Sequence, residues 1–210
     1  MRKPLFIARQ GRKPSGLLGR IVARVMAKQT ADANDLALEL LQLQPDDAVL
    51  EIGSGHGETL AKAAKVVSRG VLYGIDFADV MHRHATRRHR HLVAEKRIDF
   101  RLASSDRLPF DDRSFNKVFA VHTIYFWSTP LDHLAEAYRV LKLEGRFVLG
   151  FRPAEDPQFA ATFPSEVYHI RPEADVAQMA REAGFANVEV RRHTRGYTQI
   201  SFVIGTRANT

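Results

Sequence analysis

Cysteine is absent from this chain of 210 residues, which excludes disulfide bonds, thiolate nucleophiles and zinc sites built on cysteine. No apolar run approaches the length of roughly 18 residues that a membrane-spanning helix needs. The first residues are basic but lack the apolar segment of a secretory signal. We therefore expect a cytoplasmic protein.

Acidic residues are missing from residues 1–28, which carry eight lysine and arginine side chains. The whole chain has a formal net charge of +7, so the part after residue 28 carries only −1. The basic charge thus belongs to an N-terminal arm, and the rest of the chain is electrically ordinary.

The arm, residues 1–44, is predicted to be partly helical. Residues 1–16 contain two prolines and two glycines and are expected to be irregular or mobile. Residues 17–28 place apolar side chains on one stripe and basic ones opposite, which predicts an amphipathic helix. A second helix is expected over 35–43.

Three interpretations of the arm remain open. It can be a lid or cap over an acceptor pocket, which we favour, or a membrane-surface helix through residues 17–28. As a nucleic-acid arm it would offer only one aromatic side chain, Phe6, for stacking on bases. Nucleic acid is therefore not an expected partner.

After residue 45, short apolar runs alternate with amphipathic segments. Strands are expected at 48–52, 71–75, 98–102, 115–121, 145–151, 188–192 and 198–204. Helices are expected at 56–68, 78–94, 131–143 and 173–183, and the last two strands form a hairpin about Arg195-Gly196. This order predicts an α/β, doubly wound, mostly parallel seven-stranded sheet with an antiparallel last strand.

The strongest local signal is the segment Glu51-Ile52-Gly53-Ser54-Gly55-His56-Gly57, where glycines alternate directly after an expected buried strand. Glycine lets the backbone turn sharply and lets a ligand approach it. The N–H groups at the start of the next helix can bind polar ligand groups. A dinucleotide fingerprint would need glycine at Glu58, and Glu51 suits a cationic or amino-bearing ligand better than a pyrophosphate.

Asp76 ends the second expected strand, nineteen residues after Gly57. A carboxylate in this position can accept hydrogen bonds from the two hydroxyls of a ribose. Together with the glycine loop, it predicts a ribose-containing ligand at the carboxyl edge of the sheet.

Four spaced motifs resemble class I S-adenosylmethionine-dependent methyltransferases of the UbiE-like, methyltransferase type 11 branch, over about residues 45–204. The motifs are Glu51-x-Gly53-x-Gly55-x-Gly57 with Asp76, Leu108-Pro109-Phe110-Asp111-Asp112-Arg113-Ser114-Phe115, Glu136-Ala137-Tyr138-Arg139-Val140-Leu141-Lys142, and Ala183-Gly184-Phe185 with Val188. The chain departs from the family pattern at Ala103-Ser104-Ser105, which replaces Gly-Asp-Ala, and at Asn116, which replaces an aspartate.

The resemblance implies a Rossmann-like domain over residues 45–210 that binds S-adenosyl-L-methionine, yields S-adenosyl-L-homocysteine and needs no metal. The cofactor-binding positions it implies are Glu51, Gly53, Ser54, Gly55, Gly57, Asp76, Phe77, Ser104, Ser105 and His122. The histidines between positions 82 and 91 alternate with arginines, which would repel a metal cation.

The acceptor is expected beyond the fourth strand, at His122 to Trp127. His122 is the candidate general base, because the pKa of histidine lies near neutrality, although it can equally just border the cofactor. Tyr125 and Trp127 are expected either to form an aromatic acceptor pocket or to pack in the core. Tyr168 and His169, in the long connection after the fifth strand, are further candidates to contact the acceptor.

The sequence thus predicts an enzyme that moves a methyl group to a small, aromatic or apolar acceptor by in-line displacement. Orientation of the reactants alone can lower such a barrier by ~7–11 kcal/mol. The alternatives are a cofactor-binding module without catalysis and an RNA methyltransferase that uses the arm. The pattern fits a monomer or a homodimer.

Overall fold

The computed structural model describes residues 3–195 and 198–209, without the side chains of residues 17, 18, 20, 23, 24, 27, 28, 195 and 198. Across this part of the chain, no helix combines the length and the apolar character that crossing a membrane would require.

Seven strands form one sheet in the order β3-β2-β1-β4-β5-β7-β6. Their bounds are β1 Ala48–Ile52, β2 Val71–Asp76, β3 Ile98–Leu102, β4 Phe115–Val121, β5 Leu141–Phe151, β6 Ala186–Arg195 and β7 Thr198–Thr206. Strands β1 to β5 pair in parallel, whereas β7 runs antiparallel to both β5 and β6. The predicted doubly wound, mostly parallel sheet with an antiparallel last strand is confirmed.

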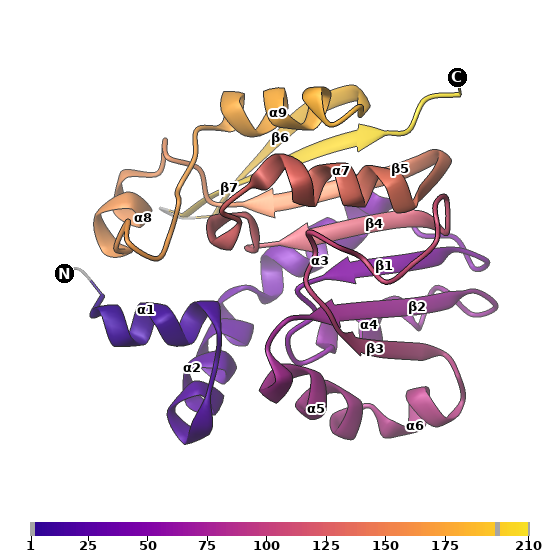
Figure 1. Cartoon of the computed structure of the whole chain (residues 1–210), viewed down its shortest axis with the longest axis horizontal. Helices are drawn as coiled ribbons and strands as arrows, with labels where there is room; N and C mark the ends of the chain where they lie inside the picture. The colour runs from indigo at the N-terminus through magenta and orange to yellow at the C-terminus, as the bar shows by residue number, and fades with distance from the viewer. Residues whose placement is uncertain (1–2, 196–197, 210) are drawn as a thin grey trace.

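Helices connect the strands and cover both faces of the sheet (Figure 1). They are α1 Leu5–Arg12, α2 Gly16–Gln29, α3 Ala31–Leu41, α4 Glu58–Ala63, α5 Asp79–Arg88, α6 Arg90–Ala94, the 3₁₀ turn η1 Ile124–Phe126, α7 Pro130–Val140, α8 Pro157–Thr162 and α9 Glu173–Glu182.

Two apolar cores lie on opposite faces of the sheet. In β1, Val49 belongs to the core that contains side chains of α3 and α4, whereas its neighbour Leu50 belongs to the core that contains side chains of α7 and α9. This follows from the period of two along a strand, which sends successive side chains to opposite faces. Each fully buried side chain of this size stabilises the fold by roughly 1.5–3 kcal/mol.

The prediction that residues 1–16 are irregular is wrong, because residues 5–12 form α1. Pro4 lies just outside the helix, at its N-cap, where its missing N–H breaks no hydrogen bond. Tertiary contacts hold the helix in place: the Lys3 backbone N–H donates to the Thr162 carbonyl over 2.7 Å, and Ala8 is buried. Gly11 faces the Tyr168 hydroxyl, which would collide with any larger side chain there.

Four expected helices differ clearly in their bounds. The helix expected over 35–43 is α3, Ala31–Leu41, and the helix expected over 56–68 is α4, Glu58–Ala63. The segment 78–94 divides into α5 and α6 at His89, whose buried ring donates from Nε2 to the His56 carbonyl over 3.1 Å. The helix expected over 131–143 ends at Val140, because Leu141 pairs with Phe115 in the sheet. The hairpin turn expected at Arg195-Gly196 involves Gly196, which lies outside the described residues, while Arg195 pairs with Thr198 across it.

Candidate cofactor and acceptor site

A cavity of about 560 Å³ lies at the carboxyl ends of β1, β2 and β4, within the range of small-molecule sites. The chain adds β2 and β3 on one side of β1 and then returns to add β4 on the other side. The strand order thus reverses between β1 and β4, and the cavity lies at this switch point of the sheet. The crevice left there by the diverging connections is the usual ligand position in such folds.

The loop after β1 forms one wall of the cavity, and its conformation requires glycine. Gly53 and Gly57 have φ angles of +79° and +76°, a region that residues with a Cβ rarely occupy. A Cβ on Gly53 would lie 2.5 Å from Cγ2 of Thr123. The N–H groups of Gly53 and Ser54 donate to the Ile75 carbonyl over 2.8 and 2.9 Å, which ties the loop to β2.

Glu51 is a buried carboxylate that lines the cavity with one oxygen unsatisfied. Its side chain is 4% exposed, and no described residue hydrogen-bonds to Oε2. Burial raises its pKa well above the usual range, and the charge of Asp76 adds to this, while a hydrogen bond from Thr59 acts in the opposite direction. The Thr123 hydroxyl, across Gly53, is also buried without a partner among the described residues. Unsatisfied buried groups are costly, and a ligand with a cationic donor would satisfy this pair.

Asp76 ends β2 beside the same loop. Its Oδ2 accepts the Gly55 N–H over 3.0 Å, and its Oδ1 accepts the Ala78 N–H over 2.8 Å. Burial raises its pKa, and these two hydrogen bonds oppose the shift. Each carboxylate oxygen keeps a second lone pair for a ribose hydroxyl. Phe77 follows with 39% of its surface exposed and lies 5.7 Å from the Lys13 ammonium.

His122 follows β4 on the opposite wall in a left-handed conformation, with φ +58°. Its Nδ1 lies 3.0 Å from the Tyr125 hydroxyl, which accepts the Arg152 backbone N–H over 2.5 Å. Burial and the charge of Arg152 lower the pKa of His122 to about 4, and burial raises the pKa of Tyr125 far above its usual value. The imidazole is therefore neutral and the phenol protonated at physiological pH.

The tautomer of His122 follows from this chain of hydrogen bonds. The buried Tyr125 hydroxyl accepts from Arg152, and among the described residues the acceptor for its own proton is His122 Nδ1. Donation to Nδ1 leaves the imidazole proton on Nε2. His122 lines the cavity and Tyr125 lies behind it. The arrangement makes His122 a hydrogen-bond donor toward the cavity.

Comparison with known proteins identifies the family. A family model described as a methyltransferase domain matches residues 50–149. The putative methyltransferase YrhH of Bacillus subtilis (strain 168) is 34% identical over 122 residues, 58% of this chain and 67% of YrhH. The chain belongs to the methyltransferase type 11 family. As a member of the S-adenosylmethionine-dependent class I, it uses S-adenosyl-L-methionine as its cofactor.

Two further relatives fit this assignment. The 2-methyl-6-phytyl-1,4-hydroquinone methyltransferase of Arabidopsis thaliana is 28% identical, over 78% of this chain and 47% of its own length, so the chain spans about half of that relative. A SAM-dependent methyltransferase from Aquifex aeolicus superposes with a TM-score of 0.68 at 22% identity, covering 82% of this chain and 88% of that one. The latter likeness concerns the fold.

Most of the cofactor positions that the sequence implies for this methyltransferase line the cavity. They are Glu51, Gly53, Ser54, Gly55, Asp76, Phe77 and His122. Gly57 is buried at the start of α4. Ser104 is exposed, and Ser105 is buried with its hydroxyl 2.7 Å from Nδ1 of His133. These two serines are not among the described residues that line the cavity, and their role toward adenine stays a prediction.

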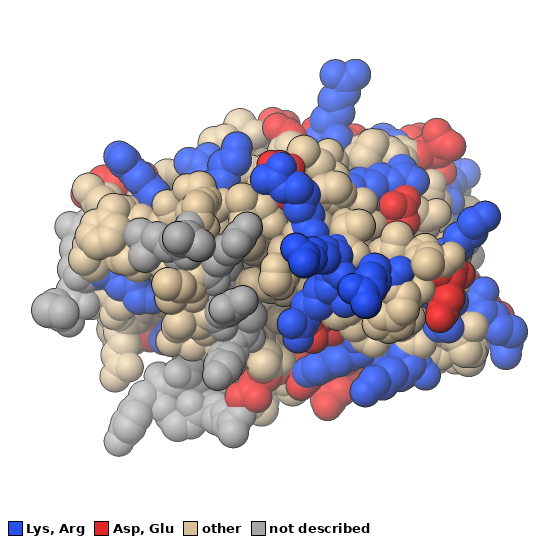
Figure 2. Space-filling view, turned by 90° about the horizontal axis from the view of Figure 1, so that it is seen from below, with Lys and Arg blue, Asp and Glu red and all other residues tan. Residues whose placement is uncertain are grey.

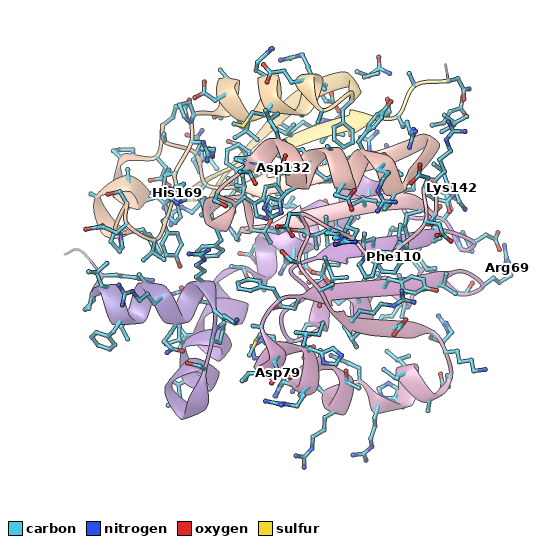
Figure 3. All side chains as sticks on the ribbon, viewed as in Figure 1. Arg69, Asp79, Phe110, Asp132, Lys142 and His169 are labelled. Carbon is cyan, nitrogen blue, oxygen red and sulfur yellow. The ribbon has the colours of Figure 1, made fainter. Side chains whose placement is uncertain are left out.

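The four predicted acceptor residues are also absent from the described lining of this cavity. Trp127 is buried and stacks on His133 with 4.8 Å between ring centroids. Tyr125 and Tyr168 are buried with 5.7 Å between their rings. His169 is exposed and lies beside α8, at the left of Figure 3, and its backbone N–H donates to the Tyr125 carbonyl. Their contact with an acceptor stays a prediction.

The N-terminal arm supplies lining residues that sequence reasoning missed. They are Gly11, Arg12, Pro14, Met26, Thr30, Ala31 and Asn34. No motif marks them, and the amphipathic pattern of 17–28 was the only signal that this segment packs on the domain. Among the described residues, no three histidine, aspartate or glutamate side chains are arranged to hold a metal ion.

Proposed function

We propose that this protein transfers a methyl group from S-adenosyl-L-methionine to a small, aromatic or apolar acceptor. The observation that carries the proposal is the unsatisfied Oε2 of Glu51, buried beside the glycine loop at the switch point of the sheet. A buried carboxylate in this position fits the ammonium group of the methionine moiety.

Each residue on the wall formed by the loop after β1 and the end of β2 would bind a different part of the cofactor. Glu51 accepts hydrogen bonds from the ammonium, and the open space at Gly55, where no atom lies within 4 Å of an added Cβ, lets the ligand reach the backbone. Asp76 accepts the ribose hydroxyls, and the exposed ring of Phe77 covers one face of adenine. When bound, the cofactor supplies a methyl group on a sulfonium, which a nucleophilic atom can displace in line.

The opposite wall would receive the acceptor. Val121, Phe126 and Met26 present apolar surface to the cavity near His122, and the Nε2–H of His122 can hold an oxygen of the acceptor in place. The Arabidopsis relative is named for a hydroquinone acceptor, which is aromatic and apolar. This similarity supports the same chemical class here.

The arm, residues 1–44, would act as a lid over the cavity. Residues of α1, α2 and α3 complete its lining, and Lys13 lies over Phe77. A lid of this kind excludes water from the reacting groups and fixes their orientation. The division at residue 44 between this lid and the cofactor-binding domain is part of the proposal. Within the arm, α3 packs in the core against the sheet, so α1 and α2 would be the parts that cover the cavity.

Calorimetric titration with S-adenosyl-L-methionine and S-adenosyl-L-homocysteine tests the proposal. Native protein should bind both ligands, and Asp76→Ala should weaken binding at least tenfold. Asp79→Ala is the matched control, because this nearby acid pairs with Arg83 on the surface of α5 (Figure 3). Transfer of labelled methyl to a panel of hydroquinones and phenols then separates an enzyme from a module that binds the cofactor without turnover.

A further inference from the structure

Exposed apolar side chains are concentrated on the first two helices. Leu5 and Phe6 of α1 are 43% and 59% exposed, and Ile21 and Val25 of α2 are 59% and 50% exposed. These four are among only ten large apolar side chains exposed to this degree in the described part of the chain. A concentration of exposed apolar side chains of this kind marks an interaction surface.

Cationic side chains accompany this apolar surface. Arg9, Arg12 and Lys13 are exposed on and just after α1, and residues 1–28 contain no acid. Exposed arginines of α5 and α6 continue this surface. Arg83 and Arg88 pair there with Asp79 and Glu58, so the added positive charge comes from Arg87 and Arg90. Figure 2 shows lysine and arginine side chains gathered over the part of the lower face where α5 and α6 lie.

The cavity lies between these two groups. Gly11 and Arg12 line it on the side of the arm, and Met81, His84 and Arg88 line it on the side of α5. Helices α1, α2, α5 and α6 run along the same side of the molecule (Figure 1). We call the exposed surface of these four helices the docking face.

We propose that the docking face binds an anionic lipid surface. Leu5, Phe6, Ile21 and Val25 enter the boundary between headgroups and acyl chains, while the arginines of α5 and α6 contact the phosphates. This combination of exposed apolar side chains and basic residues is the composition of interfacial helices. Nucleic acid would attract the arginines as well, but of the four exposed apolar side chains only Phe6 offers a stacking surface for bases, whereas Leu5, Ile21 and Val25 are aliphatic.

Docking in this orientation brings Arg12 and Arg88, which line the cavity, to the membrane. An apolar acceptor dissolved in the lipid would then reach His122 and Phe126 without crossing water. This consequence for the acceptor rests on the proposed function, whereas lipid binding itself does not depend on it.

Cosedimentation of the full chain with vesicles tests the proposal. We expect binding to phosphatidylcholine vesicles that contain about 30% phosphatidylglycerol, weaker binding to phosphatidylcholine alone, and loss of most binding when salt is raised from about 0.1 to 0.5 M. The double variant Phe6→Glu/Ile21→Glu should bind at least tenfold more weakly. Arg87→Glu/Arg90→Glu should also lose affinity, since each basic residue near such a surface is worth about fivefold.

Matched controls exclude general effects of added charge. Leu143→Glu adds a charge at an exposed leucine near the amino end of β5, whereas the cavity lies at the carboxyl ends of the strands. Arg181→Glu reverses an exposed charge on α9. Both should bind vesicles like the native protein. Circular dichroism and the affinity for S-adenosyl-L-methionine of every variant show whether the fold and the cofactor site are intact.

Any of three results would overturn the proposal. The first is native protein that binds the cofactor but none of the vesicles. The second is vesicle binding unaffected by Phe6→Glu/Ile21→Glu. The third is tighter binding to single-stranded RNA that only the arginine variants weaken. Failure of the proposed function would instead appear as a loss of cofactor binding or methyl transfer in protein that still sediments with anionic vesicles.

Discussion

The Tyr125 hydroxyl lies 3.0 Å from Nδ1 of His122 and holds that histidine between the sheet and the cavity. The same hydroxyl accepts the Arg152 N–H, and among the described residues its own buried proton finds an acceptor at Nδ1 of His122. Tyr125 is thus a positioning residue that acts through His122.

Replacing Tyr125 by phenylalanine should lower the turnover number roughly tenfold and leave cofactor affinity within about twofold. The ring still fills the buried site, but His122 loses its fixed tautomer and the Arg152 N–H loses its acceptor, which should cost about 1–3 kcal/mol of unfolding free energy. Nitrogen-15 NMR of the imidazole checks the assignment. A native spectrum with the proton on Nδ1 would contradict it.

Replacing Glu51 by glutamine should stabilise the unliganded protein and weaken cofactor binding at least tenfold. The folded-state pKa of Glu51 is raised, so ionisation of the buried acid destabilises the fold, and stability falls as pH rises from the ordinary pKa of about 4.5 to the raised one. Thermal melting at pH 5 and pH 8 should show the gain at pH 8. Undiminished cofactor affinity would show that Glu51 does not bind the ammonium.

His122 should make the fold less stable in acid. Its folded-state pKa is lowered to about 4, so the unfolded chain takes up a proton between the ordinary value of about 6.5 and pH 4 while the folded chain does not, and this removes about 3 kcal/mol of stability. His122→Asn tolerates the positive φ and should lose less stability over that range. Urea denaturation at pH 7.5 and pH 4.5 measures both proteins.

The methyl-transfer rate of the native protein should be independent of pH near pH 6.5. His122→Asn should therefore leave the shape of the pH profile unchanged there. With its pKa lowered to about 4, His122 keeps one protonation state across this range, whereas a general base with the ordinary histidine pKa of about 6.5 would titrate there. A bell-shaped profile whose acid limb disappears in His122→Asn would restore the general-base role that the sequence suggests.

Gly55→Ala should abolish cofactor binding at a small cost in stability. Gly55 has φ +51° and open space where a methyl group would be added, so alanine costs only about 1 kcal/mol of backbone strain but projects into the ligand's path. Gly16→Ala is the matched control, with φ +59° and equally open space at the start of α2. Gly16→Ala should lose a similar amount of stability and bind the cofactor like the native protein. Equal cofactor affinity of the two variants would show that Gly55 does not lie in the cofactor site.

Local sequence was sufficient to predict the strand, the glycine loop and the helix at the wall of the cavity that follows β1. Glu51, Gly53 and Gly57 lie within one strand, loop and helix, where the positive φ angles allow little besides glycine, and Asp76 comes at the end of the next strand. The alternation of strands and helices was enough to predict the sheet. These features depend on residues that are close in sequence and on the periods of strand and helix. A single amino-acid sequence is therefore sufficient to predict them.

Other features depended on contacts between distant segments. Residues 5–12 are helical because Tyr168 and Thr162 provide a surface for them, and Ser105 is occupied by His133, 28 positions away. Met26 and Asn34 line the cavity only because the arm folds back across it. Periodicity tells which face of a segment is buried but not which partner buries it, and that choice was made by packing in three dimensions.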